Sequence, residues 1–311
     1  MCHLVVRISL VAALLVSVLD VTGCSTLGVS NIPVDQMKMN YSTGDDKFFS
    51  YKGMEVRYRD EGSGPVLVLL HGVCSSLETW DGWVSQMKGQ FRVIRLDIPG
   101  FGITGPALDR NDYSIERAVE FLDTFATHAN FSIAGNSLGG YIAWNYALKY
   151  PHKVNKLILI DPVGYTQKMP WLLRFASNPV IRPMARHIMP RMFFDKAVYQ
   201  VYGDKSKVTP EIKKRYFEFA MREGNKGSYV DIFTLMRKQN ESPTLSNEIP
   251  NIKAPTLVMW GTKDEWTPFE NLDKWKKDLP SATFISYDAA GHVPMEELPE
   301  ITAKDALEFL R

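Results

Sequence analysis

Residues 131–140 read FSIAGNSLGG, and this stretch decides the fold. The apolar run FSIA predicts a buried strand, and the small and apolar residues from Leu138 onward predict a helix. Ser137 lies at the turn between them, with Gly135 two positions before it and Gly139 two positions after it. Such a turn lifts the serine hydroxyl above the end of the sheet and leaves no room for side chains at the two flanking positions. The stretch predicts a nucleophile at Ser137; a glycine-rich helix start without chemistry is the alternative.

Strand and helix signals alternate on both sides of this stretch. Apolar runs without polar interruption are typical of strands in a parallel sheet that helices cover on both faces. Such runs and shorter β-rich segments predict strands at residues 48–51, 54–58, 66–70, 93–96, 157–160, 256–260 and 283–287. The intervening sequence predicts helices at residues 114–129, 138–150, 269–279 and 300–310. The alternation predicts an α/β fold with a doubly wound, mostly parallel sheet.

Residues 165–248 interrupt the alternation. They contain no convincing strand and carry 15 lysines and arginines against 8 aspartates and glutamates, a net charge of +7 in a chain whose formal charge is +1. We interpret them as a helical cap inserted into a core formed by residues 47–164 and 249–311. Because the cap follows the carboxyl end of a strand, where such sheets bind ligands, we expect it to cover the site. Its basic, aromatic-rich surface is either a solvated face or a contact with anionic lipid.

The N-terminus has the features of an export signal. Arg7 precedes a mostly apolar run of 12 residues, Ile8–Leu19, which suits a signal segment and is short for a membrane span. Residues 21–24 read VTGC and resemble the lipobox of bacterial lipoproteins, whose cysteine receives a diacylglycerol. We therefore expect residues 1–24 to be a signal ending at Cys24, residues 25–46 to be a tether, and the protein to be anchored to a membrane of the bacterial cell envelope. An uncleaved anchor and an ordinary signal peptide are the alternatives.

Charge and cysteine content exclude other classes. Lysine and arginine number 36 and aspartate and glutamate 35, which argues against a dedicated nucleic-acid binder. Three cysteines cannot form a disulfide scaffold or a zinc site of four thiolates. We therefore expect neither a nucleic-acid partner nor a structural metal.

Several motifs stand in a particular order along the chain. His71-Gly72 follows the strand predicted at 66–70, DIPGFG occupies residues 97–102, and the Ser137 turn, Asp264 and Gly291-His292 come after them. In this order the motifs resemble the α/β-hydrolase superfamily over residues 48–311. The resemblance implies the α/β-hydrolase fold, with an eight-stranded, mostly parallel sheet and an inserted helical cap. It also implies a serine–histidine–aspartate triad that hydrolyses its substrate through a covalent acyl-enzyme, without a metal or cofactor.

The resemblance assigns catalytic roles to individual residues. Ser137 is expected to attack the substrate and His292 to take the serine proton as general base. Asp264 is expected to orient the imidazole and stabilise its charged form. Glu265 and Asp161 are rivals for this acidic role, and Asp264 is preferred because a Gly-x-x-Asp run after this strand is the commoner arrangement in the superfamily.

Two backbone N–H groups are expected to form an oxyanion hole. Leu138 follows the nucleophile, and Val73 lies in the loop after the strand at 66–70. His71 is expected to brace that loop. Cys74 is rejected as a nucleophile because no strand–turn–helix unit presents it.

The serine at the turn narrows the reaction class. Haloalkane dehalogenases and epoxide hydrolases of this fold use aspartate there, so we predict a serine carboxylester hydrolase of the lipase or esterase type. Its substrate would be a small-molecule ester or a lipid. Asn136 and the DIPGFG turn also resemble the meta-cleavage-product hydrolases, which cut carbon–carbon bonds, and that activity is the first alternative. A non-catalytic lipoprotein that binds a hydrophobic ligand is the second.

Overall fold

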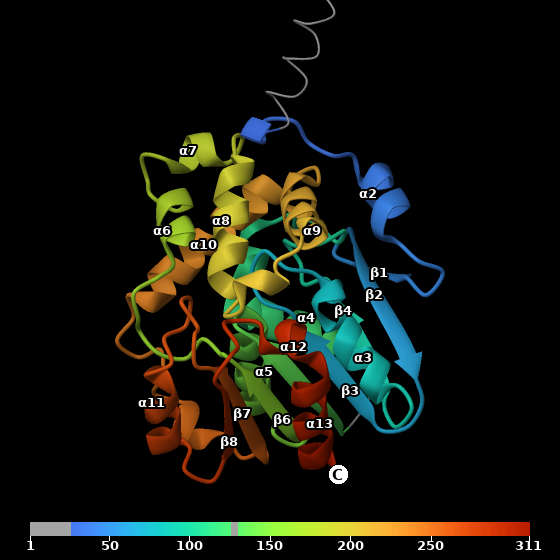
Figure 1. Ribbon diagram of the computed structural model, residues 1–311, viewed down its shortest axis with the longest axis vertical. Coiled ribbons are helices and arrows are strands. Elements are labelled where there is room, and N and C mark those ends of the chain that lie inside the picture. The colour runs from blue at the N-terminus through green and yellow to red at the C-terminus, as the bar shows by residue number, and fades with distance from the viewer. Residues whose placement is uncertain (1–25, 126–129) are drawn as a thin grey trace, which may run out of the picture.

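The computed structural model describes residues 26–125 and 130–311 (Figure 1). The predicted signal at residues 1–24, including Cys24, lies outside the described residues. Within the described ranges, no helix is long and apolar enough to cross a membrane.

An eight-stranded sheet forms the centre of the molecule. In chain order the strands are β1 (Lys47–Tyr51), β2 (Met54–Gly62), β3 (Val66–Leu70), β4 (Arg92–Leu96), β5 (Phe131–Asn136), β6 (Val154–Ile160), β7 (Thr256–Gly261) and β8 (Thr283–Tyr287). Their spatial order is β1-β2-β4-β3-β5-β6-β7-β8. The pairings of β2 with β1 and β4 are antiparallel, and the other pairings are parallel. The predicted fold class is confirmed.

The register of the central strands brings their carboxyl ends to one edge of the sheet. Leu70 at the end of β3 pairs with Gly135 of β5, and Asn136 at the end of β5 pairs with Ile160 of β6. Every residue of β5 and β7 is buried, so helices must cover both faces of the sheet there. The loops that follow β3, β5, β6 and β7 therefore meet above the middle of the sheet.

The core helices pack in two groups. Helix α3 (Asp81–Met87) packs on α13 (Pro299–Leu310), where the indole of Trp83 donates a 2.8 Å hydrogen bond to Thr302. Helix α4 (Ile115–Phe125) packs on α5 (Leu138–Lys149), and an edge-on contact between Trp144 and Trp275 joins α5 to α11 (Asn271–Asp278). The remaining core elements are short: α12 (Pro294–Glu297) and single 3₁₀ turns at Leu77–Trp80, Arg110–Tyr113 and Ile249–Asn251.

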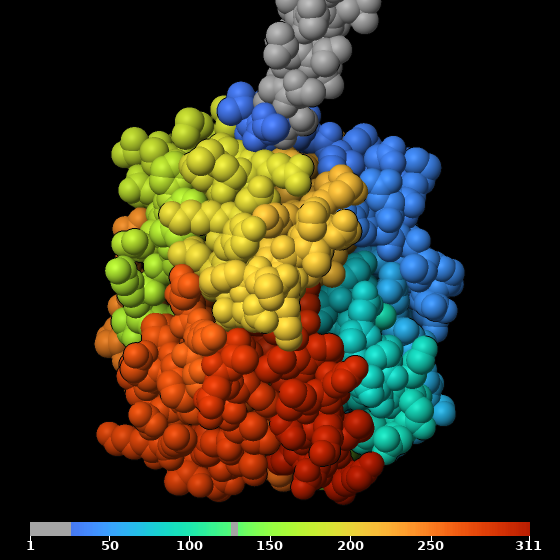
Figure 2. Space-filling view, in the orientation of Figure 1, coloured from blue at the N-terminus to red at the C-terminus, as the bar shows by residue number. Residues whose placement is uncertain are grey.

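The chain between β6 and β7 is helical. It contains α6 (Trp171–Ala176), α7 (Arg182–Ala185), α8 (Arg191–Val201), α9 (Pro210–Met221) and α10 (Asn225–Asn240), with a 3₁₀ turn at Lys205–Lys207. In Figure 1 these helices stand together above the carboxyl edge of the sheet. Figure 2 shows α8 and α9, in yellow, lying directly on the C-terminal part of the core on this face of the molecule. Access to the carboxyl ends of the strands therefore runs past this helical segment.

The segment predicted to be a tether packs against the rest of the molecule over its described residues. It contains a helix, α2 (Val34–Tyr41), which buries Met37 completely. The N–H of Ile32 donates a 2.7 Å hydrogen bond to the carbonyl of Met221 on α9, and the Tyr41 hydroxyl donates to Glu218 at 2.7 Å. Contacts with α9 therefore stabilise α2, because the tertiary packing of a helix can stabilise it even where its sequence lacks a helical pattern of apolar residues.

Candidate active site

Ser137 occupies a strained turn between β5 and α5. Its backbone has φ of 54°, a left-handed conformation that non-glycine residues adopt rarely. A Cβ on Gly135 would lie 2.3 Å from the carbonyl oxygen of Gly139, and a Cβ on Gly139 would lie 2.2 Å from that of Leu70. Glycine at both positions is therefore required by backbone contact, and the turn presents Ser137 at the start of α5.

Neighbouring strands hold this turn in place. The N–H of Ser137 donates to the carbonyl of Ile160 at 3.0 Å, and the N–H of Val163 donates to the Ser137 carbonyl at 3.3 Å. The loop after β3 also passes close to Ser137, because a Cβ on Gly72 would lie 3.1 Å from Cβ of Ser137. The serine is thus fixed between the loops that follow β3 and β6.

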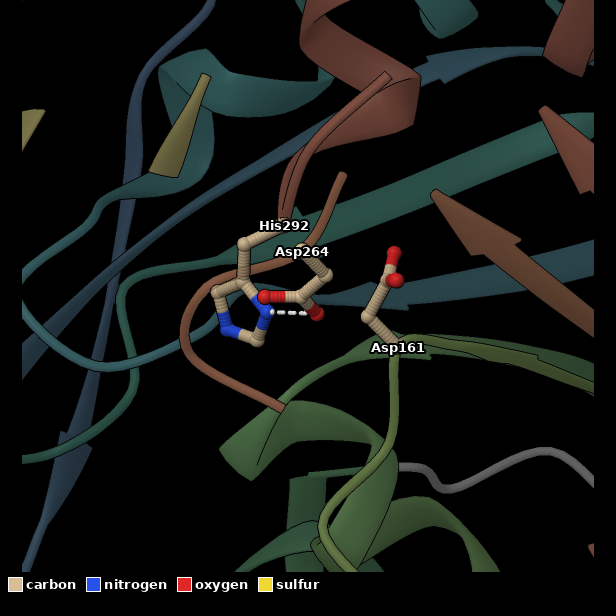
Figure 3. Close-up of side chains that lie close together, drawn as sticks. All are labelled: Asp161, Asp264 and His292. Atoms are coloured by element: carbon tan, nitrogen blue, oxygen red, sulfur yellow. Dashed lines mark hydrogen bonds and ion pairs between the residues drawn. The ribbon is translucent and has the colours of Figure 1, made fainter. Parts of the chain in front are cut away.

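His292 and Asp264 form a buried hydrogen-bonded pair (Figure 3). Nδ1 of His292 lies 2.7 Å from Oδ2 of Asp264, and the two side chains are 4% and 0% exposed. The other carboxylate oxygen, Oδ1, accepts backbone N–H bonds from Trp266 at 2.6 Å and Thr267 at 3.0 Å. These donors fix the carboxylate against the ring, so Nδ1 carries the proton and Nε2 is left as the basic nitrogen.

Thr267 was not singled out from the sequence and contacts both members of the pair. Its hydroxyl donates to Oδ2 of Asp264 at 2.5 Å and lies 3.2 Å from Nδ1 of His292. Thr267 therefore helps to hold the carboxylate of Asp264 against the imidazole. The three-residue spacing from Asp264 to Thr267 is the sequence signal that could have identified it.

The two rival carboxylates occupy different positions. Glu265 faces the surface, where it pairs with Lys205 at 3.2 Å. Asp161 is fully buried on the far side of Asp264 from the imidazole (Figure 3), and its Oδ1 accepts the N–H of Gly261 at 2.9 Å. Burial, together with the neighbouring charge of Asp264, raises the pKa of Asp161 well above its usual range. Of the three carboxylates, Asp264 is the one hydrogen-bonded to His292.

The backbone of His292 is tied to the nucleophile turn and to the helical segment. Its carbonyl accepts a 2.9 Å hydrogen bond from the side-chain amide of Asn136, and its N–H donates to the carbonyl of Val201 at 2.7 Å. Nε2 of His292 is buried and has no hydrogen-bond partner among the described residues. Asn136, the residue before Ser137, thus links the nucleophile turn to the loop that carries His292. Nε2 of His292 is left free to receive a proton. Hydrogen bonds between nucleophile and base often close only when substrate is bound.

The predicted oxyanion residues lie in the two loops that meet at Ser137. Leu138 is the first residue of α5, and Val73 follows Gly72. Within the part of the chain that the structure describes, the N–H of neither residue donates a hydrogen bond. Free N–H groups at a helix N-terminus and in an adjoining loop suit stabilisation of an oxyanion.

His71 and Cys74 have structural environments. Nδ1 of His71 bonds the carbonyl of Gly72 at 2.7 Å, and Nε2 accepts the N–H of Ile98 at 3.0 Å, so this histidine braces the loops after β3 and β4. Burial lowers its pKa to about 4, which keeps the ring neutral. Burial also raises the pKa of the Cys74 thiol, so no thiolate is available there as a nucleophile.

One group of side chains has the composition of a metal site. Ligand atoms of Asp161, Asp264 and His292 lie within 4.8 Å of one another, and no other such group occurs in residues 26–125 and 130–311. The oxygens of Asp264 are already engaged by two N–H groups, the Thr267 hydroxyl and the imidazole. A metal would have to displace these bonds, so the donor set fits a hydrogen-bonded catalytic pair better than a cation site.

Two apolar cavities flank the site. The elbow-side cavity, of about 570 Å³, lies beside Leu138 and is lined chiefly by Ile98, Phe101, Leu138, Tyr141, Ile232 and Met236. The histidine-side cavity, of about 440 Å³, lies under α8 and is lined chiefly by Val73, Leu172, Phe194, Val198, Trp266 and His292. Because Ser137 and His292 are almost fully buried, these cavities provide the room for a substrate beside them.

Comparisons with known proteins agree with this geometry. A 2-hydroxy-6-oxo-6-(2'-aminophenyl)hexa-2,4-dienoic acid hydrolase of Metapseudomonas resinovorans is 26% identical over 272 residues, covering 85% of this chain and 90% of that protein. Lipase 1 of Psychrobacter immobilis is 28% identical over 267 residues, covering 83% of this chain and 81% of the lipase. The crystal structure of a bacterial membrane phospholipase A is similar with a TM-score of 0.72 and 25% identity, covering 100% of this chain and 98% of that one.

The family model described as alpha/beta hydrolase fold matches residues 65–299, which include the Ser137 turn, Asp264 and His292. With the sheet order and the nucleophile turn described above, this match identifies the chain as a member of the α/β-hydrolase fold family.

Proposed function

We propose that the protein is a serine carboxylester hydrolase of the lipase or esterase type. The observation that carries the proposal is the buried 2.7 Å hydrogen bond between Asp264 and His292, which leaves Nε2 of His292 without a partner among the described residues. Both side chains lie at the carboxyl edge of the sheet that also presents Ser137. A serine hydroxyl needs such a base to become nucleophilic.

In the proposed reaction, Ser137 Oγ attacks the ester carbonyl carbon while Nε2 of His292 takes the hydroxyl proton. The carbonyl oxygen becomes an oxyanion that accepts hydrogen bonds from the N–H groups of Val73 and Leu138. The intermediate then expels the alcohol, which receives the proton from His292, and the acyl group remains on Ser137. Water, deprotonated by His292, releases the carboxylic acid and restores the serine, with Asp264 stabilising the imidazolium in both steps.

The inner cavity linings suit an apolar chain better than a charged group. The relative from Metapseudomonas resinovorans acts on a dienoic acid, which carries a carboxylate. Neither the elbow-side nor the histidine-side cavity has a lysine or arginine among its described lining residues. A buried carboxylate without a cation or other compensating partner is costly, whereas an apolar acyl chain is favoured there.

Substitution of the nucleophile tests the proposal. Ser137→Ala should lower kcat on p-nitrophenyl esters by roughly 10⁴-fold or more, with an unchanged circular dichroism spectrum. Ser85→Ala, at an exposed serine on α3, is the matched control and should retain full activity. Equal ester hydrolysis by Ser137→Ala and wild type would refute the assignment. Faster turnover of a vinylogous diketone acid than of every ester tried would favour the carbon–carbon alternative.

We also propose that the chain is held to a membrane through Cys24. The proposal is supported by the lipobox-like sequence and by apolar side chains at the end of the molecule where the described chain begins. The side chains of Val180 and Met192 are 84% and 70% exposed, and Leu27 is 54% exposed. Next to Leu27, the carbonyl of Gly28 accepts a hydrogen bond from the N–H of Met189 at 3.3 Å, which joins the first described residues to this apolar surface. Large exposed apolar side chains on one surface mark a contact with a partner or a membrane.

Metabolic labelling with a clickable fatty acid tests the anchor. The label should be incorporated into the full chain and into Cys2→Ala and Cys74→Ala, and it should be lost only in Cys24→Ala. Equal labelling of Cys24→Ala and wild type would contradict the anchor.

A further inference from the structure

The outer mouth of the cavity system is basic. Two open hollows, of about 760 and 530 Å³, adjoin the segment between β6 and α6, and Lys168 and Arg174 line both of them. Both side chains are exposed, and among the described residues neither forms a salt bridge or a side-chain hydrogen bond. Two unpaired cations therefore share one rim.

The carboxylates on this rim are already paired. In the larger hollow Glu241 accepts from Arg237 at 3.3 Å. In the smaller hollow Glu265 pairs with Lys205 at 3.2 Å and accepts from Gln200 at 3.4 Å. These acidic groups therefore do little to neutralise Lys168 and Arg174, and the rim keeps a positive potential.

Both hollows share lining residues with cavities beside the proposed catalytic residues. The larger one shares Gln167, Met169 and Asn240 with a connecting cavity of about 420 Å³ that is also lined by Leu138. Gln167 and Asn240 are tied together at this boundary, because the amide of Asn240 donates to the carbonyl of Gln167 at 2.8 Å and its oxygen accepts the N–H of Gln167 at 3.0 Å. The smaller hollow shares Trp266 with the histidine-side cavity. The two cations thus stand at hollows that adjoin the apolar inner cavities.

We propose that Lys168 and Arg174 bind an anionic group of the ester substrate while its apolar chain occupies the inner cavities. The proposal rests on the proposed esterase function and names its substrate class, an ester amphiphile with an anionic head group. The inner linings hold apolar side chains and no cation, whereas the rim holds cations, so a molecule with one apolar end and one anionic end matches the path. Phosphate and carboxylate head groups share this chemistry, and the experiment distinguishes them.

Three water-soluble esters with the same hexanoyl chain test the proposal on the full-length protein: a neutral glycerol ester, a glycerophosphoester and an ester of a hydroxycarboxylic acid. The double variant Lys168→Ala/Arg174→Ala should lower kcat/KM for one or both anionic esters by about tenfold or more and leave the neutral ester within about twofold. Lys168→Glu/Arg174→Glu should lower kcat/KM for the anionic esters further. Salt should lower this kcat/KM in the wild type by screening the two cations, and it should no longer do so in the charge-reversed variant. Lys88→Glu/Lys304→Glu, at exposed lysines on the core, changes the net charge equally. It should leave the ratio of kcat/KM for the anionic esters to kcat/KM for the neutral ester unchanged.

The outcomes separate the anion site from the esterase function. A loss confined to the phosphoester assigns the rim to phosphate head groups, and a loss confined to the carboxylate ester assigns it to hydroxy-acid esters. Equal loss on the neutral ester, or no loss on any anionic ester while the wild type hydrolyses them, overturns the anion site and leaves the esterase standing. No hydrolysis of any of the three esters by the wild type overturns the esterase function and this inference with it.

Discussion

At the scale of single residues, the carboxylates around His292 differ in their hydrogen bonds. The Asp264 carboxylate accepts hydrogen bonds from two N–H groups and from the Thr267 hydroxyl. Asp161 has a raised pKa because it is buried beside that anion. Asp264 therefore orients the imidazole, whereas burial beside Asp264 disfavours the charged form of Asp161.

This difference predicts unequal effects of isosteric substitutions. Asp264→Asn should lower kcat on soluble esters by about 10⁴-fold, because the amide favours the wrong imidazole tautomer. Asp161→Asn leaves the Asp264–His292 hydrogen bond in place and should change kcat by less than about tenfold. Glu265→Gln, at the surface, should change kcat little. Steady-state kinetics of the three purified variants measure this. A loss for Asp161→Asn as large as that for Asp264→Asn would move the acidic role to Asp161.

At the scale of elements, helix α8 connects the helical segment to the catalytic loop. Phe194 and Val198 face the histidine-side cavity, and the carbonyl of Val201 at the end of the same helix accepts the N–H of His292. The helix therefore both shapes the cavity and holds the loop that carries the base.

The size of residue 198 should set the preferred acyl length. Val198→Phe reduces the cavity volume and should lower the ratio of decanoyl to butyryl ester kcat/KM, while Val198→Ala should raise it. Met192→Phe adds an aromatic ring to an exposed position of the same helix and should leave the ratio unchanged. The ratio is measured with p-nitrophenyl esters of both lengths. If Phe and Ala at position 198 gave the same ratio as wild type, the acyl chain would have to bind elsewhere.

Elements with a strong local signal could be predicted from sequence, and those that depend on distant contacts could not. Strand β5 and the Ser137 turn follow from an apolar run and two glycines, although the strand continues two residues further, to Asn136, than the predicted strand. Helix α2 has weak periodicity and is stabilised by contacts with α9, more than 170 residues later in the chain. Asn136 acts through a hydrogen bond to the carbonyl of His292, 156 residues later in the chain, so its role could not be derived from spacing.

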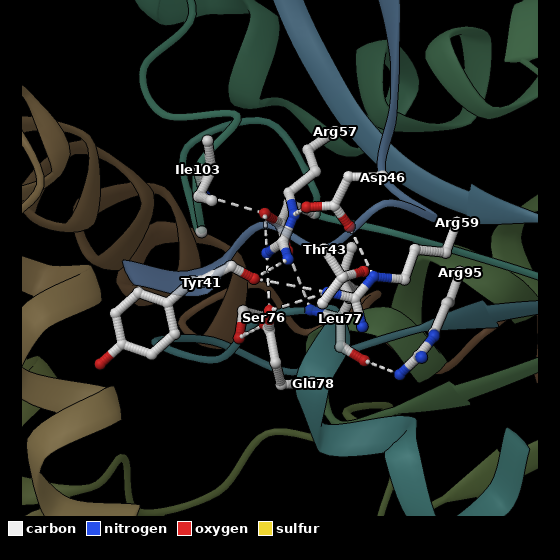
Figure 4. A network of polar contacts seen from close by, with 12 residues as sticks. Tyr41, Thr43, Asp46, Arg57, Arg59, Ser76, Leu77, Glu78, Arg95 and Ile103 are labelled. Carbon is white, nitrogen blue, oxygen red and sulfur yellow. Dashed lines mark hydrogen bonds and ion pairs between the residues drawn. The ribbon is translucent and has the colours of Figure 1, made fainter. Parts of the chain in front are cut away.

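At the scale of the whole molecule, a buried ionic network joins the N-terminal segment to the core (Figure 4). The guanidinium of Arg57 is fully buried and pairs with Asp46 at 2.8 Å, Glu78 at 2.7 Å and Asp97 at 3.5 Å. Asp97 also accepts the N–H groups of Leu77 and Ile103, both at 2.8 Å. One cation thus compensates carboxylates from three separate parts of the chain.

Removing that cation should be strongly destabilising. Arg57→Met leaves buried carboxylates without their partner and should lower the free energy of unfolding by about 3–5 kcal/mol. Urea denaturation followed by tryptophan fluorescence measures the change. Arg117→Met, which removes an exposed pair with Glu120, should leave the unfolding midpoint unchanged. An equally small effect at Arg57 would show that the network contributes little to stability.

The same network predicts the direction of acid sensitivity. Burial opposes ionisation of Asp46 and Glu78, but hydrogen bonds from Arg57 and Arg59 to Asp46, and the Arg57 charge near Glu78, outweigh it and lower both pKa values. Burial raises the pKa of Asp97 to about 6, so Asp97 acts in the opposite direction and is protonated before the other two as the pH falls. Groups with a lowered folded pKa stabilise the fold above their unfolded pKa, near about 4, and this contribution is lost as the pH falls through the folded value. Unfolding midpoints in urea should therefore fall as the pH decreases below about 4, and Arg57→Met should weaken that dependence. A variant with the same acid dependence as wild type would contradict this origin.

The central claim of the account is that Ser137 is an activated nucleophile. Reaction of the full-length protein with a fluorophosphonate probe, followed by peptide mass spectrometry, tests it directly. We expect a single modified peptide that contains Ser137, is absent in Ser137→Ala and forms more slowly in Asp264→Asn. A protein that hydrolyses esters while the probe modifies a different residue, or none, would contradict it.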